Sequence, residues 1–141
     1  MNIALRAHLV VAWLLVAGIV VQVFLAGMGV FDDPEFFLTH ATWGYTLEML
    51  PIVMLVLAAV GRLGRRQVLF AVGIFGLFLL QSVFVALRVD QPMVAALHPV
   101  NGFAILLVSI VAAREAWAAR GIETGATTTS RLEAAAAGDG R

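Results

Sequence analysis

The stretch PMVAALHPVNGF, residues 92–103, begins a long apolar run and repeats a pattern that occurs earlier in the chain. Residues 34–45 read PEFFLTHATWGY, so both stretches have the form P-x5-H-x3-G followed by an aromatic residue. Upstream of each, VFLAG (23–27) and VFVAL (83–87) occupy comparable positions. Such self-similarity predicts a chain built from two tandem helical hairpins.

The composition indicates that these hairpins lie in a membrane. Of the 141 residues, 62% are hydrophobic and 13% are charged, and the mean hydropathy is +0.98. Soluble domains carry about 25% charged residues. The chain has no cysteine, which excludes disulfides, thiolate catalysis and iron–sulfur clusters. The net charge is zero and no basic cluster with interleaved aromatic residues occurs, so we expect no nucleic-acid partner.

Four apolar runs are each long enough to cross a bilayer, which needs about 20 helical residues. They predict helices at about 8–30, 34–60, 67–89 and 92–118. Because the links are short, neighbouring helices should run antiparallel. We therefore predict an all-α integral membrane protein in which residues 1–120 form one up-down four-helix bundle. Residues 121–141 are small and polar without apolar periodicity, and we expect a disordered or weakly helical cytoplasmic tail.

The arginines predict the orientation of this bundle in the plasma membrane. Six of them belong to the end that carries both termini: Arg6, Arg62, Arg65, Arg66, Arg114 and Arg120. The opposite end has Arg88 alone, among the carboxylates of Asp32, Asp33, Glu35 and Asp90. Since positive residues accumulate on the cytoplasmic side, both termini are predicted to be cytoplasmic.

The repeat also predicts where its two histidines lie. Each follows its proline by six residues, which is roughly 9 Å into a helix at about 1.5 Å per residue. Both helices begin on the outer side, so His40 and His98 should lie at the same depth and can face each other. Their helices are diagonal neighbours, with axes very roughly 11–14 Å apart. This gap fits two imidazoles with a metal between them.

A haem iron is the metal that such a pair suits. A bare metal ion needs three or four protein ligands, and no further Cys, Asp or His is available at that depth. A haem iron needs only two axial ligands. Gly44 and Gly102 share a helix face with the histidines and leave room for a flat macrocycle. The sequence therefore predicts a b-type haem held by His40 and His98 near the outer face.

Such a haem would serve electron transfer or haem sensing, with a redox partner or a second copy of the chain as candidate partners beside the lipid bilayer. Arg88 ends the third helix at the outer surface, where a guanidinium would suit haem propionates. Ordinary snorkelling of a helix-end arginine is the alternative. No nucleophile–base pair or phosphate loop occurs, which favours an electron carrier or membrane subunit over a stand-alone enzyme.

Glu48 is a second candidate site, near mid-membrane and about 80° around the helix from His40. An intramembrane carboxyl is a functional hypothesis by default. It would be neutral and hydrogen-bonded to the Leu47 carbonyl, Gln22 or Gln81, or it would carry protons in a small proton-coupled transporter. A further alternative is a non-enzymatic subunit or scaffold whose histidines only tie helices together.

The motifs QVFLAGMGVF with H-x3-G, and LHPVNGF, resemble those of a family of small four-span bacterial membrane proteins. More distantly, about residues 5–120 are similar to one four-helix half of haem A synthase. This resemblance implies that His40 and His98 correspond to the haem ligands on the second and fourth helices of that half. The synthase's catalytic half also has a glutamate one turn before its first histidine and an outer-loop cysteine pair. This chain has Phe37 and no cysteine there, which puts haem-modifying chemistry in doubt.

Overall fold

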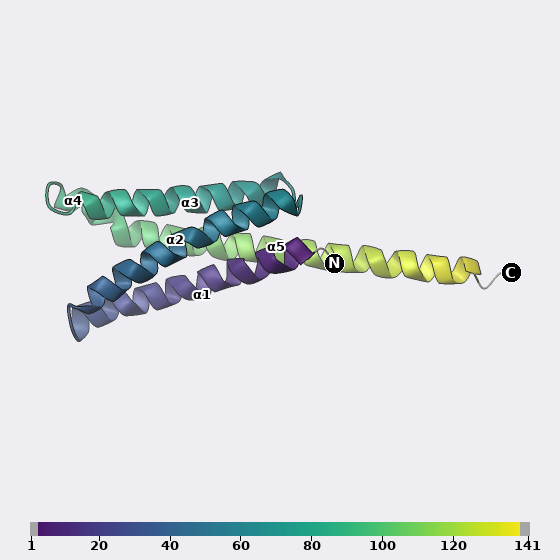
Figure 1. The fold of residues 1–141 in the computed structure, drawn as a ribbon, viewed down its shortest axis with the longest axis horizontal. Coiled ribbons are helices and arrows are strands. Elements are labelled where there is room, and N and C mark those ends of the chain that lie inside the picture. The colour runs from purple at the N-terminus through teal and green to yellow at the C-terminus, as the bar shows by residue number, and fades with distance from the viewer. Residues whose placement is uncertain (1–2, 139–141) are drawn as a thin grey trace.

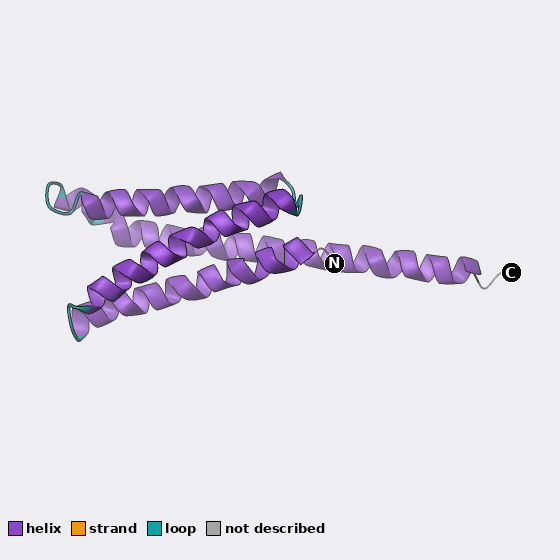
Figure 2. Ribbon diagram, in the orientation of Figure 1, coloured by secondary structure: helices purple, strands orange, loops and turns teal. Residues whose placement is uncertain are grey.

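The computed structural model describes residues 3–138, with the side chains of residues 3–120, and this part of the chain contains helices and turns only (Figure 2). The helices are α1 (Ile3–Phe31), α2 (Phe36–Val60), α3 (Arg65–Ala86), α4 (Pro92–Ala95) and α5 (Leu97–Gly138). Four of them are long and apolar, and they pack as an up-down bundle (Figure 1). The predicted fold class is confirmed.

The four long helices form a ring. α1 packs against α2 and α5, and α3 packs against the same two helices, so α1 and α3 are diagonal to each other, as are α2 and α5. The centre of the bundle is filled by apolar side chains, including Leu15, Met54, Ile74 and Phe78. Short links join successive helices, which is why neighbours in the chain are antiparallel neighbours in space.

The outer surface of the bundle is apolar as well. Large side chains such as Phe24, Val56, Phe103 and Leu107 are each more than half exposed. A water-soluble monomer rarely exposes contiguous apolar surface on this scale, whereas lipid tails solvate it. The chain is therefore a multi-pass membrane protein, whose candidate spans are Ile3–Phe31, Phe36–Val60, Arg65–Ala86 and Pro92–Arg120.

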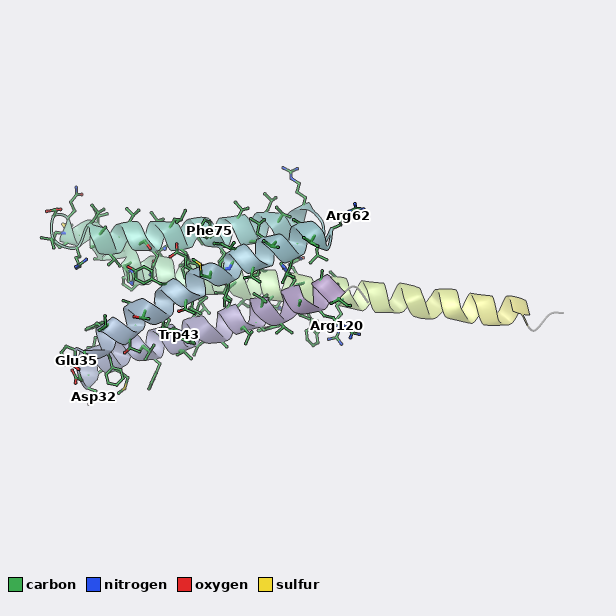
Figure 3. The ribbon with its side chains drawn as sticks, viewed as in Figure 1. Asp32, Glu35, Trp43, Arg62, Phe75 and Arg120 are labelled. Atoms are coloured by element: carbon green, nitrogen blue, oxygen red, sulfur yellow. The ribbon has the colours of Figure 1, made fainter. Side chains whose placement is uncertain are left out.

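The two ends of the bundle differ in charge and in shape. We call the end with the links 32–35 and 87–91 the histidine end, and the end with the link 61–64 the arginine end. Asp32 and Glu35 lie at the histidine end, and Arg62 and Arg120 lie at the arginine end (Figure 3). Toward the histidine end, the hairpin of α1 and α2 diverges from the hairpin of α3, α4 and α5 (Figure 1).

The start of α2 differs from the prediction by two residues. Pro34 was expected in the first turn of the helix, but α2 begins at Phe36. Asp33 Oδ1 accepts the N–H of Glu35 at 2.9 Å, and the Phe36 N–H donates to the Asp33 carbonyl at 3.0 Å. Asp33 thus holds a tight turn ahead of the helix, because a short carboxylate competes well for nearby backbone N–H groups.

The fourth span is interrupted at Ala96, where one helix from 92 to 118 was predicted. α4 ends at Ala95 and α5 begins at Leu97. Pro99 has no N–H to offer the carbonyl of Ala95, so a continuous helix would lack a hydrogen bond here. By starting a new helix at Leu97, the chain brings Pro99 into a first turn, where the missing N–H costs nothing.

α5 continues to Gly138 and so includes residues 121–138 of the tail that was expected to be disordered or weakly helical. Intrinsic propensity favours a helix there, because residues 134–137 are four successive alanines, the strongest helix former. The cytoplasmic location of this tail stays a prediction. Residues 139–141, the end of the predicted tail, lie outside the described residues.

Candidate haem site at the histidine end

His40 on α2 and His98 on α5 meet across the diagonal of the bundle. Their ring centroids lie 6.2 Å apart, and the ring planes are tilted by 58°. The two helices make no backbone contact, so only the side chains reach across. Both imidazoles are partly buried. The repeat therefore brings its two histidines together at one depth, as its spacing predicts.

His40 is held by Gln22 of α1 through both ring nitrogens. Nδ1 lies 3.0 Å from the Gln22 backbone carbonyl, and Nε2 lies 3.2 Å from the Gln22 side-chain Nε2. A carbonyl only accepts, so Nδ1 carries the proton and donates it. Nε2 then keeps its lone pair, which accepts an amide N–H from Gln22. This tautomer leaves Nε2 as the nitrogen able to bind a metal.

The second hairpin repeats this arrangement one turn further on. Three residues after His40, Trp43 Nε1–H donates to the Gly18 carbonyl at 2.9 Å. Three residues after His98, Asn101 Nδ2–H donates to the Leu77 carbonyl at 2.9 Å. Gly18 lies four residues before Gln22, and Leu77 lies four residues before Gln81. The internal repeat thus includes its hydrogen bonds, and Figure 3 shows Trp43 on α2 beside α1.

The glutamine of the second hairpin bonds differently. Gln81 Oε1 accepts a second N–H of Asn101 at 2.6 Å. The Gln81 backbone carbonyl lies close enough to interact with the His98 ring, but His98 Nδ1 is buried and makes no hydrogen bond. His98 is therefore held less firmly than His40.

Gly44 makes room for Gln22, whereas a side chain at Gly102 would reach only an ordinary contact distance from Gln81. A Cβ on Gly44 would lie 2.8 Å from Gln22 Nε2, and a Cβ on Gly102 would lie 3.6 Å from Gln81 Nε2. The prediction that the glycines leave space for a macrocycle stays a prediction. In the structure, the adjacent space belongs to two flexible amide side chains.

Neither Arg88 nor Glu48 makes a hydrogen bond to the paired imidazoles. Arg88 is exposed, and its Nη1 donates to the Val85 carbonyl at 3.1 Å, so it caps the end of its own helix. Glu48 is partly buried, and among the described side chains none hydrogen-bonds it. Of its three expected partners, Gln22 contacts His40 through its amide nitrogen and Gln81 contacts Asn101 through its amide oxygen.

His8 is a buried polar residue to which the sequence analysis gave no role. Its side chain is fully buried near the arginine end. Nδ1 lies 3.1 Å from the Met54 carbonyl of α2, and Nε2 lies 3.2 Å from Gln67 Oε1 of α3. The signal was present in its spacing, because Leu5, Ala12 and Leu15 line the same buried face. His8 connects three helices.

An open hollow lies at the arginine end, away from the paired histidines. A groove of about 440 Å³ is lined by Trp13, Arg114, Trp117 and Ala118. Tryptophan and arginine are typical of the membrane–water interface, so we interpret this groove as part of the interfacial belt. Among the described residues, no three His, Cys, Asp or Glu side chains come together as ligands for a bare metal ion.

Part of this chain matches the model of one protein family. Residues 22–87 match the model described as "Family of unknown function (DUF6220)". This segment begins at Gln22 and includes His40, Gly44, Glu48 and Gln81, but it ends before His98. No curated protein and no solved structure matches the chain.

Proposed function

We propose that this membrane protein binds one b-type haem between His40 and His98 and serves in electron transfer or haem sensing. The observation that carries the proposal is the 6.2 Å separation of the two imidazole centroids. Two coaxial imidazoles on one metal would have centroids about 6.2 Å apart, given metal–nitrogen bonds of about 2.0 Å and about 1.1 Å from each nitrogen to its ring centre. The spacing therefore suits an iron between the rings.

The hydrogen bonds of His40 support the same function. Metal-bound histidines commonly donate their second N–H to a backbone carbonyl or carboxylate, which fixes the tautomer and raises the basicity of the ligating nitrogen. His40 Nδ1 has such a bond to the Gln22 carbonyl. A metal at Nε2 would displace the Gln22 amide that contacts this nitrogen. The glutamine side chain can adopt another rotamer while its backbone carbonyl stays bonded to Nδ1.

Two unpartnered polar atoms at the histidine end show that this polar cluster is incompletely satisfied within the described chain. Gln22 Oε1 and His98 Nδ1 are buried without a hydrogen bond, among the side chains that the structure describes. A buried polar atom without a partner costs about 1–3 kcal/mol. Haem would supply the chemistry of a one-electron carrier, while the chain would supply two nitrogen ligands and an apolar surrounding.

The absorption spectrum of the detergent-purified protein from haem-sufficient cells tests this proposal. We expect a Soret band with sharp α and β bands after reduction by dithionite. The variant His40→Ala/His98→Ala should lose all three, because it has no axial ligand at this site. Its helix content and elution volume should match the wild type. A folded, colourless wild type would contradict haem binding and would favour the scaffold, in which the histidines only connect helices.

We further propose that the histidine end faces outward and the arginine end faces the cytoplasm. Arg62, Arg65 and Arg66 are exposed at the arginine end, whereas Asp32 and Glu35 are exposed at the other. Positive residues are retained on the cytoplasmic side. The haem would then lie near the outer surface, where an extracytoplasmic redox partner could reach it.

This orientation can be measured directly because the chain contains no cysteine. We expect Asp32→Cys to react with a membrane-impermeant maleimide on intact cells or spheroplasts, and Arg62→Cys to react only after lysis. Both positions lie in links, so neither substitution disturbs the packed core. The reverse labelling pattern would contradict the orientation and would move the haem to the cytoplasmic side.

A further inference from the structure

The two imidazoles differ in what fixes them. His40 has both ring nitrogens engaged by Gln22 of the neighbouring helix, at 3.0 and 3.2 Å. His98 has a buried Nδ1 without a hydrogen bond, although it occupies the equivalent place in the second hairpin. The Asn101 and Trp43 bonds one turn away are equivalent in the two hairpins. The asymmetry therefore does not extend to the hydrogen bonds one turn further on.

The helix backbone around His98 is also less regular than the helix backbone around His40. α2 runs without a break from Phe36 through His40 to Val60. In the second hairpin the helix is interrupted at Ala96, and His98 is the second residue of α5, directly before Pro99. A residue in the first turn after an interruption is held by fewer helical hydrogen bonds than one inside a continuous helix. His98 therefore lies in a first helical turn and lacks the ring hydrogen bond that His40 has.

This difference determines the strength of the two bonds to a metal. A hydrogen bond to the second ring nitrogen fixes the ring and increases its donor strength, and loss of such a partner typically weakens metal binding by about 10–100-fold. His40 has this support at 3.0 Å, whereas His98 Nδ1 has only the looser approach of the Gln81 carbonyl. His98 should consequently dissociate first from an iron held by both.

We infer that His98 is the exchangeable ligand and that the site accepts a small neutral diatomic molecule, of the class of carbon monoxide, on the His98 face. This inference rests on the proposed haem. His98 would release the group from its Nε2 atom, whose lone pair would become free again, and the neutral diatomic molecule would take its place without any transfer of electrons. His40 would continue to hold the group through its own Nε2 atom.

Haem content and spectra of the two single variants test the inference. We expect His98→Ala to keep haem in a five-coordinate form held by His40, with a broadened reduced spectrum. His40→Ala should retain at most about one tenth of the haem of the wild type, because its remaining ligand, His98, is the weakly held one. Free imidazole should restore the sharp six-coordinate spectrum in His98→Ala. Elution volume and helix content separate haem loss from misfolding.

Carbon monoxide added to the reduced wild type provides the second measurement. We expect a shifted Soret band, with a rate limited by dissociation of His98 and therefore independent of carbon monoxide at high concentration. His98→Ala should react faster by at least about 10-fold. Pro99→Ala leaves both imidazoles in place but restores the N–H that a continuous helix needs. It should slow the reaction.

The outcomes distinguish the two proposals. A colourless wild type overturns haem binding, and with it the exchange. A coloured wild type in which both single variants lose haem equally, or in which His98→Ala loses more, overturns the assignment of His98 alone. A coloured wild type that does not react with carbon monoxide overturns it as well.

Discussion

Replacing Gly18 by leucine should prevent α1 and α2 from packing and should lower the free energy of unfolding by about 3 kcal/mol, at the upper end of overpacking costs. Gly18 is buried, and a Cβ built there collides with Leu47 Cδ2 of α2. Its carbonyl also accepts the Trp43 indole N–H at 2.9 Å. A larger side chain would separate the helices and break this bond. The loss would appear as a lower thermal midpoint in detergent.

Gly27 provides the matched control in the same helix. A Cβ at Gly27 meets nothing within 4 Å, so Gly27→Leu adds the same side chain without a collision. It should leave the thermal midpoint unchanged or raise it slightly, because leucine is the better helix former. The double variant Gly18→Ala/Leu47→Ala should be more stable than the sum of its single effects predicts, since the second change removes the colliding atoms. Equal effects at Gly18 and Gly27 would contradict this account.

Replacing His8 by leucine should cost about 2 kcal/mol in the free energy of unfolding. The imidazole is fully buried and lies at hydrogen-bond distance from the Met54 carbonyl and from Gln67 Oε1. Leucine fills a similar volume but leaves the Gln67 amide buried and without its partner, which costs about 1–3 kcal/mol. Chemical unfolding of the detergent-solubilised variant, followed by circular dichroism, measures the loss.

The double variant His8→Leu/Gln67→Leu separates a lost hydrogen bond from poor packing. It should recover most of the stability, because replacing both partners by apolar groups leaves no unpaired polar atom. If the double variant is as unstable as His8→Leu, then the shape of the imidazole matters and its hydrogen bonds do not. Neither substitution touches the histidine end, so the spectrum expected of the proposed haem should be the same in both variants as in the wild type.

Periodicity and repetition were enough to predict the architecture. Apolar runs of bilayer length gave four spans, and short links gave their antiparallel order. The histidine pair followed from two copies of one motif, because equal spacing from equivalent prolines implies equal depth. These features are properties of single helices and of chain connectivity, which a sequence expresses directly.

The partners of the histidines could not be predicted in this way, because they depend on how two helices are rotated against each other. Gln22 precedes His40 by 18 residues, and Gln81 precedes His98 by 17. Because the two spacings differ by one residue and the second helix is interrupted at Ala96, the sequence repeat did not show that Gln22 and Gln81 are equivalent. The partners of Glu48 could not be predicted for the same reason. The rotation of α2 brings His40, and not Glu48, to Gln22 of α1, and the carboxyl has no hydrogen bond among the described residues.

The confinement of the polar contacts to single hairpins has a consequence for assembly. At the histidine end, Gln22, His40 and Trp43 bond only within the first hairpin, and Gln81 and Asn101 bond only within the second. The hydrogen bonds that fix His40 thus form within one hairpin, and the paired site lies at the interface between the two hairpins. Two separate hairpins that dimerise about a twofold axis could form the same site, with the link 61–64 serving only to raise their effective concentration.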